Sequence, residues 1–190
     1  MLSTYRQLAG EREAQGIPPL PLSSLQVEEL TCLLEKKSIK EKPELLYLLS
    51  ERVPPGVDEA AYVKATWLSA IAAKRKSSPA ITPIKATELL GTMIGGYNVS
   101  ALIELLKSTD QLLASCAAEG LSHILLVYDA VNEIMDLSKE NHFAKQVINS
   151  WAAAEWFTSK NELAQEITVT VFKVNGETNT DDLSPATHAT

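Results

Sequence analysis

Residues 53–98, VPPGVDEAAYVKATWLSAIAAKRKSSPAITPIKATELLGTMIGGYN, show the pattern that decides the fold: apolar helical segments separated by tight breaks. The run VPPG at 53–56 stops one helix, because proline lacks a backbone N–H and restricts the residue before it. Asp58 is well placed to start the long helix that follows. Thr82 and Pro83 then supply a capping hydroxyl and a proline at the first helical position. Gly95-Gly96 ends that helix.

The same alternation extends over residues 2–166 and predicts about nine or ten short helices. Ser24 is expected to cap one of them, Gly120 to end another, and residues 123–137 and 141–157 to form the last two. Short connections make neighbouring helices antiparallel. A run of such pairs favours an all-α superhelix of the HEAT or armadillo kind, although no repeat has a fixed period and an irregular orthogonal bundle remains the alternative.

The character of the sequence changes near residue 166. Residues 167–174, ITVTVFKV, are rich in β-branched residues and alternate in polarity, which predicts one β-strand. A strand needs neighbours to satisfy its backbone, and the sequence offers none. We therefore expect a helical domain over 1–165 and, over 166–190, the truncated start of a sheet-containing domain, or a segment that borrows a sheet edge elsewhere.

Composition limits the possible functions. The chain has 190 residues, 45% of them hydrophobic, and a formal net charge of −7, which suits a globular protein and argues against a nucleic-acid surface. No stretch is apolar enough to span a membrane, and residues 1–13 do not resemble a secretory signal. Cys32 and Cys116 are predicted to be buried, reduced thiols of a cytoplasmic protein, too few to hold an iron–sulfur cluster or a structural zinc.

Residues that could carry chemistry are scattered. The segment 91–96, GTMIGG, lacks the Lys-Ser/Thr of a phosphate loop and is expected to be a helix end with a tight turn. His123 is predicted to be a partly buried structural residue at a helix start, and His142 to be exposed. Asp181 and Asp182 point to opposite sides of an extended segment, which makes them poor metal ligands.

The aromatic residues admit two interpretations. They are Trp67, Trp151, Trp156, Tyr128 and Phe157. At helical spacing they are expected to pack in the core or between helices, and the alternative is a docking surface for another domain. From the residues alone, the sequence predicts a soluble, acidic, helical domain without a self-contained active site.

Four long segments resemble one known family over nearly the whole chain. They are RVPPGVDEAAYVKA at 52–65, ELLGTMIGGYN at 88–98, AKQVINSWAAAEWF at 144–157 and TVTVFKVNGETNTDDLSPA at 168–186. In this order they resemble the N-terminal region of bacterial aconitate hydratase B. That resemblance implies a HEAT-like helical domain followed by the start of the swivelling β/α domain.

The resemblance also implies a function for the complete enzyme. Members of the family are large cytoplasmic enzymes that interconvert citrate and isocitrate through cis-aconitate on a [4Fe-4S] cluster. The helical domain is associated with dimerisation, with access to the active site and with contacts to other proteins, including other metabolic enzymes. Members also bind messenger RNA. The cluster cysteines lie downstream of this chain, so neither Cys32 nor Cys116 takes that role.

Asp181 is the candidate site residue that the resemblance supplies. The string NTDDLSPA at 179–186 resembles the entrance loop of aconitase-type swivel domains, which would place Asp181 at the rim of the substrate site in a complete enzyme. The alternative is a loop acid that caps local backbone N–H groups. The chain alone is expected to be inactive and to bind partners. Two alternatives stay open, a free-standing helical scaffold and an RNA-binding module.

Overall fold

The structure is a computed structural model that describes residues 1–36, 41–160, 164–170 and 176. The chain divides into two units, Met1–Thr158 and Ser159–Thr190. The described residues contain ten helices: α1 (Leu2–Glu13), α2 (Ser24–Leu34), α3 (Lys42–Glu51), α4 (Glu59–Ala72), α5 (Pro83–Gly91), α6 (Val99–Leu106), α7 (Gln111–His123), α8 (Ala130–Leu137), α9 (His142–Ala152) and α10 (Glu155–Thr158). The all-α prediction is confirmed.

Polar side chains fix the start of most of the long helices. Asp58 accepts from the backbone N–H of Ala61, and Thr82 from that of Lys85. The cap of α2 is Ser23, one residue before the predicted Ser24, because its hydroxyl accepts from the N–H of Gln26 while the Gln26 side chain accepts from the N–H of Ser23. This reciprocal pairing satisfies two of the N–H groups that a helix start leaves unbonded.

The prediction that Gly120 ends a helix is wrong. α7 continues through Gly120 to His123, and residues 124–129 form the next turn instead of part of a helix over 123–137. Gly120 is needed for packing, because a Cβ atom built on it would lie 2.9 Å from the Cα of Gly91 on α5. Two helices cross backbone to backbone at this point, and only glycine allows so close an approach.

The helix predicted over 141–157 is interrupted. α9 ends at Ala152, and Ala154 has a φ of +53°, in the left-handed region that ends helices. The single turn α10 follows. A sequence rich in alanine gives no sign of this break, because alanine has the highest helix propensity.

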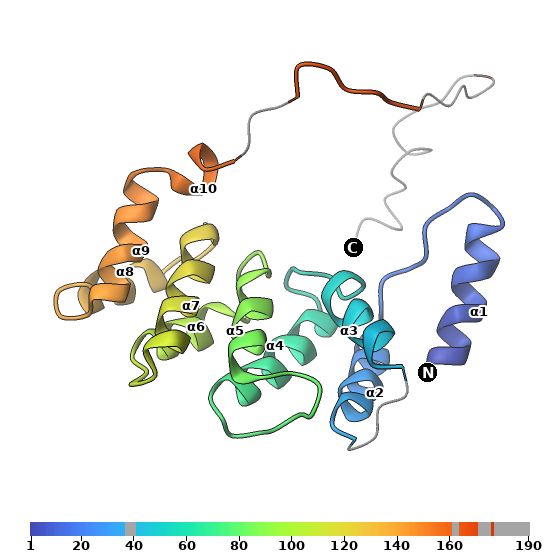
Figure 1. Ribbon diagram of the computed structural model, residues 1–190, viewed down its shortest axis with the longest axis horizontal. Coiled ribbons are helices and arrows are strands. Elements are labelled where there is room, and N and C mark those ends of the chain that lie inside the picture. The colour runs from blue at the N-terminus through green and yellow to red at the C-terminus, as the bar shows by residue number, and fades with distance from the viewer. Residues whose placement is uncertain (37–40, 161–163, 171–175, 177–190) are drawn as a thin grey trace. The chain divides into compact units, whose positions relative to one another are not determined.

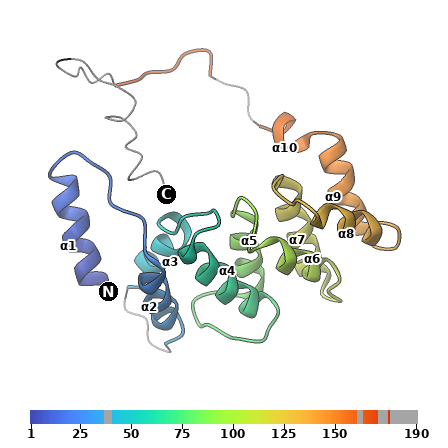
Figure 2. The same ribbon diagram turned by 180° about the vertical axis from the view of Figure 1, so that it is seen from behind.

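The helices from α2 to α9 pack on one another in chain order. α2 packs on α4, α4 on α5, α5 on α7 and α7 on α9. In Figures 1 and 2 the turns that follow α3, α5 and α7 lie along one edge of this row, and the turns that follow α4 and α6 lie along the opposite edge. Neighbouring helices therefore alternate in direction, as short connections require.

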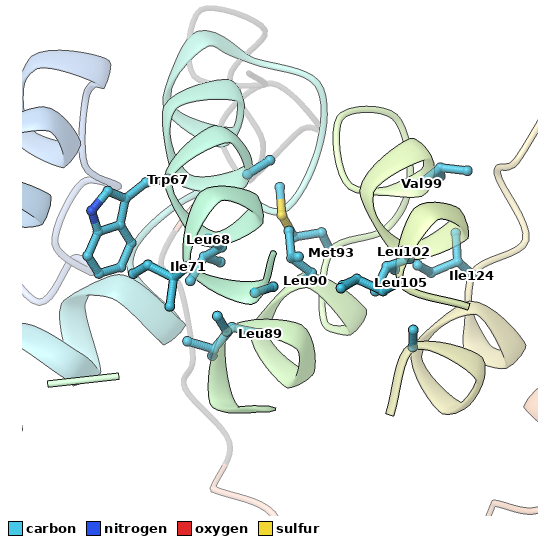
Figure 3. Packing of buried hydrophobic residues seen from close by; sticks show 14 of the residues in the cluster. Trp67, Leu68, Ile71, Leu89, Leu90, Met93, Val99, Leu102, Leu105 and Ile124 are labelled. Carbon is cyan, nitrogen blue, oxygen red and sulfur yellow. The ribbon is translucent and has the colours of Figure 1, made fainter. Parts of the chain in front are cut away.

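One hydrophobic cluster runs through this row, from Leu22 to Val147. Figure 3 shows its middle part, where Leu68 and Ile71 of α4 face Leu90 of α5, and Leu102 of α6 continues the layer. Every helix from α2 to α9 contributes buried side chains to this cluster. The helices depend on their neighbours for burial, as in a stack of helix pairs. The HEAT-type superhelix itself stays a prediction.

In the second unit, the described residues 159–160, 164–170 and 176 form neither helix nor strand. The first half of the predicted strand, residues 167–170, belongs to these. Its second half, residues 171–174, lies outside the described residues. The domain boundary at 165 stays a prediction, as does the start of a sheet-containing domain.

Candidate functional site

Three turns at one edge of the helix row form an exposed apolar ridge, which we call the loop edge. It consists of the turns at 53–58, 92–98 and 124–129 together with Tyr62 on the first turn of α4. Figure 1 shows the three turns following α3, α5 and α7 along the same edge. Segments that are about 35 residues apart in sequence, one helix pair each, are therefore neighbours in space.

Hydrogen bonds and ring packing join the first turn to the second. The backbone N–H of Ile94 donates to the carbonyl of Pro55 over 3.1 Å. The hydroxyl of Tyr97 donates to the carbonyl of Val57 over 3.0 Å. The rings of Tyr62 and Tyr97 meet edge to face, with centroids 5.1 Å apart. Such aromatic pairs add to the stability that burial alone provides.

A backbone bridge joins the second turn to the third. Gly95 pairs with Leu126 in an isolated parallel β-bridge. Gly95 has a φ of +131°, and a Cβ atom built on it would lie 2.5 Å from the carbonyl oxygen of Leu126. Both the backbone angle and the contact therefore demand glycine. The predicted turn at Gly95-Gly96 is confirmed. The structure adds that this turn pairs with the turn at 124–129 through the Gly95–Leu126 bridge.

Asn98 anchors the second turn by hydrogen bonds from its side chain to backbone carbonyls. Its side chain is buried, and its Nδ2 donates to the carbonyls of Leu90 and Met93 over 2.7 and 3.3 Å. Leu90 lies at the end of α5, whose last C=O groups lack helical partners, and Met93 lies in the turn itself. The side chain of Asn98 thus links the end of α5 to the turn that precedes α6.

The loop edge exposes large apolar side chains although its backbone is fixed. Val57 is 69% exposed and Tyr128 is 75% exposed, and the others are Tyr62, Ile94, Tyr97, Leu125 and Leu126. Tyr128 also has a φ of +47°, a conformation that non-glycine residues rarely adopt. A contiguous exposed apolar patch on a rigid support is typical of a protein interaction site.

The aromatic residues divide between the two interpretations of the sequence. Trp67 is buried, and Trp151 is half-buried with its indole N–H donating to the carbonyl of Leu121 over 3.1 Å. Tyr128 and Phe157 are exposed. Trp67 and Trp151 therefore take part in packing. Tyr128 and Phe157 lie in exposed positions that suit docking.

The cysteine prediction needs correction. Cys32 is exposed and Cys116 is half-buried, because each lies on the outer side of its helix while leucine and alanine neighbours take the core positions. Burial, together with the nearby carboxylates of Glu88 and Glu119, raises the pKa of the Cys116 thiol. A raised pKa lowers the thiolate fraction, so Cys116 is a weak nucleophile.

The histidine prediction is wrong for His123. It lies at the end of α7 and is exposed, and its Nε2 is 3.0 Å from the carboxylate of Glu119, one turn earlier. The predicted helix start at His123 depends on a helix end at Gly120, and α7 continues through Gly120. The prediction for His142 is confirmed: it is exposed, and its ring lies against that of Phe143.

Asp181 lies outside the described residues. Within the described part of the chain, no group of three or more His, Cys, Asp or Glu side chains is arranged to hold a metal ion. No helix of that part has the length and apolar character needed to cross a membrane.

Sequence reasoning missed the third turn of the loop edge. Residues 124–128, ILLVY, were expected within a helix, because an apolar run of this length suits a buried helix as well as a turn packed on its neighbours. This turn is paired through Leu126 with Gly95, which lies 31 residues earlier in the sequence, so no local signal predicts the turn.

A family model and several curated proteins match this chain over most or all of its length. Residues 4–157 match the family model described as the aconitate B N-terminal domain. Curated relatives include the aconitate hydratase B of Synechocystis, 58% identical, and that of Escherichia coli, 54% identical, each over all 190 residues. The protein from Helicobacter pylori is 47% identical over 188 residues. The chain spans 22% of the length of these relatives.

The helical unit Met1–Thr158 and the family match at 4–157 cover nearly the same residues. With a matching model over most of the chain and relatives more than half identical over its whole length, the chain belongs to the family of aconitate B N-terminal domains.

Proposed function

We propose that this chain works as the helical N-terminal domain of a cytoplasmic aconitate hydratase B, and that its own task is to bind the remaining domains of that enzyme. The complete enzyme would interconvert citrate and isocitrate through cis-aconitate. The exposed apolar loop edge carries the proposal, because such a surface is stable in a larger protein when another domain covers it. A rigid docking domain of this kind can also shape access to the active site.

The two cysteines of this chain cannot supply the ligands for the [4Fe-4S] cluster of the proposed enzyme. Cys32 lies on α2 and Cys116 on α7, and each cluster needs several thiolates brought together. The cluster would therefore belong to other domains, and the reaction is not assigned to any residue here.

A chimera tests the docking role. In the Synechocystis relative, the matching 190 residues are replaced by this chain, and Val57→Asp with Tyr128→Asp is introduced. We expect the chimera to turn over citrate, and the double variant to lose most of its turnover and to unfold at a lower temperature. A carboxylate buried in an apolar interface has no partner and opposes docking.

Leu112→Asp is the matched control, because Leu112 is 68% exposed on the first turn of α7, at the opposite edge of the row. It should leave turnover unchanged. A double variant as active and as stable as the chimera, or a Leu112 variant equally impaired, would refute docking through the loop edge.

The residue Asp181 is proposed, on the resemblance of residues 179–186, to line the substrate site of the complete enzyme. Asp181→Asn in the same chimera should lower kcat for citrate while leaving the unfolding temperature unchanged. Equal kcat in both proteins would leave Asp181 with a purely local role as a capping acid.

Self-association is proposed as a second property, supported by the exposed aromatic side chains Tyr128 and Phe157. The isolated chain should sediment as a homodimer at tens of micromolar, and the Tyr128→Asp variant should shift toward the monomer. A monomeric mass for the unmodified chain would contradict this. Binding of messenger RNA receives no support from the net charge of −7.

A further inference from the structure

A groove of about 540 Å³ runs between α2 and α4. Tyr62 is the one described residue of the loop edge that also lines this groove. Glu28 and Thr31 of α2 form one wall. Val63, Thr66 and Trp67 of α4 form the other, and the cations Arg75 and Lys76 lie at its end, after α4. The wall on α2 is polar, and the wall on α4 is mainly apolar and ends at two cations. Such a groove suits an amphipathic peptide segment.

The charged end of the groove is held in place by a shared carboxylate. Glu35 accepts a hydrogen bond from the indole N–H of Trp67 over 2.6 Å and forms an ion pair with Lys76 over 2.6 Å. Burial disfavours the charged form of Glu35, but the hydrogen bonds from Lys76 and Trp67 outweigh it and hold the pKa of this carboxyl below its ordinary value. Glu35 therefore stays ionised, fixes the Trp67 ring and neutralises Lys76.

Arg75 is left as the available cation. Its side chain has no hydrogen bond or ion pair with any residue that the structure describes, whereas the flanking Lys74 is paired with Asp110 and Lys76 with Glu35. Arg75 also lines a second groove of about 510 Å³ between α4 and α6. In that groove, Lys107 is paired with Glu104 and Glu133.

We propose that the groove between α2 and α4 binds an amphipathic segment of a partner protein, with apolar side chains against Val63 and Ala70 and an acidic side chain paired with Arg75. Charge complementarity selects this occupant. The chain carries a net charge of −7. Of the residues that the structure describes, one carboxylate, Glu28 on α2, lines the groove, whereas Arg75 and the paired Lys76 lie at the end after α4, so this end is a local positive point on an acidic molecule. A planar guanidinium also matches a carboxylate with two parallel hydrogen bonds.

The test uses the 190-residue chain and two fluorescein-labelled synthetic peptides. Both are amphipathic, with leucines at i, i+4 and i+7 spacing, and they differ only in carrying glutamates or glutamines in the last turn. Fluorescence anisotropy gives the Kd of each peptide. We expect the glutamate peptide to bind about two- to fivefold more tightly than the glutamine peptide, the upper part of the range for a solvent-exposed ion pair.

Two variants separate the charge from the groove. Arg75→Gln should remove the preference for glutamate and leave binding of the glutamine peptide unchanged. Thr66→Glu places a carboxylate on the exposed groove wall and should abolish binding of both peptides. Lys139→Gln on the turn after α8 is the control, because it removes the same charge from an exposed lysine outside the groove, and it should change neither Kd.

The proposal is overturned if neither peptide binds saturably, or if both bind equally. It is also overturned if the preference for glutamate survives in Arg75→Gln, if Lys139→Gln removes it, or if Thr66→Glu, with unchanged circular dichroism, binds both peptides as the unmodified chain does. Displacement of the peptide by millimolar glutarate would indicate a site for small free dicarboxylates and would likewise exclude a protein segment as the occupant.

Discussion

Lys64 is an ionisable side chain inside the apolar core. It lies on α4 and is only 1% exposed. Burial lowers the pKa of its ammonium group from 10.5 to about 8, and the negative charge of Glu51 offsets part of that shift. The folded state therefore holds a cation in surroundings that disfavour it, and the side chain reduces stability wherever it is protonated.

The sign of the pH dependence follows from this shift. Because the folded-state pKa lies below that of the unfolded chain, the folded state binds fewer protons between about pH 8 and pH 10.5, and stability rises with pH in that window. Over the whole window the contribution of Lys64 amounts to on the order of 3 kcal/mol.

Urea unfolding compared between the chain and Lys64→Met measures this contribution. The methionine variant should be more stable at neutral pH, and the difference should shrink as the pH is raised from about 8 to about 10. Parallel pH profiles for the two proteins would mean that Lys64 has an ordinary pKa in the folded state.

Gly120 tests the close crossing of α5 and α7. A methyl group at this position meets the Cα of Gly91, a backbone atom that cannot move aside without separating two helices. Gly120→Ala should lower the free energy of unfolding by about 2 kcal/mol, the usual cost of overpacking, despite the better helix propensity of alanine.

Gly10 provides the matched control, because it lies inside α1 and a Cβ atom there would have no neighbour within 4 Å. Gly10→Ala should raise stability by up to about 1 kcal/mol. The crossing would be disproved as a constraint if both substitutions moved the unfolding midpoint in the same direction.

At the scale of elements, Asn141 joins two helices. Its Oδ1 accepts from the N–H groups of Phe143 and Ala144 at the start of α9, over 2.9 and 3.0 Å. Its Nδ2 donates to the carbonyl of Leu106 at the end of α6, over 2.8 Å. One side chain thus satisfies the start of one helix and the end of another.

Substitution separates the two roles of Asn141. Asn141→Ala should cost about 1–2 kcal/mol, because it removes the cap and the link to α6. Asn141→Asp keeps the capping oxygen but loses the donor, so its loss should be intermediate. Thermal and urea unfolding measure both, and an aspartate variant as unstable as the alanine variant would show that the cap contributes nothing.

Helix starts could be predicted from sequence because their signals are local. Asp58 and Thr82 each cap a helix at the predicted position, and Ser23 caps α2 one residue before the predicted Ser24, since a capping side chain bonds a backbone N–H only two or three residues away. The continuation of α7 through Gly120 could not be predicted, because its cause is Gly91 on another helix. A glycine that ends a helix and one that lets two helices touch look alike in one sequence.

The same reasoning applies to the candidate site. Val57, Tyr97 and Tyr128 are ordinary residues of three separate turns, and nothing local says that they share an edge. Their proximity results from the stacking of helix pairs, which places every second turn on the same side. Exposure of apolar side chains is likewise a property of the packed structure. The sequence therefore predicted the turns at 53–56 and 95–96 but not the surface they build.

At the scale of the whole molecule, the unit Met1–Thr158 is a stack of helices with one continuous core and an exposed apolar edge. Its relatives are more than four times longer, since the chain covers 22% of their length. On the two proposals made above, the loop edge and the groove between α2 and α4 would give this part of the protein a binding role, and the chemistry would belong to other domains.

Turnover of citrate tests this division most directly. The isolated chain and the Synechocystis chimera are treated identically with iron and sulfide under anaerobic conditions, and formation of cis-aconitate is followed by its ultraviolet absorbance. We predict steady turnover by the chimera and none by the isolated chain at any concentration. Turnover by the isolated chain that rises in proportion to its concentration would contradict the account.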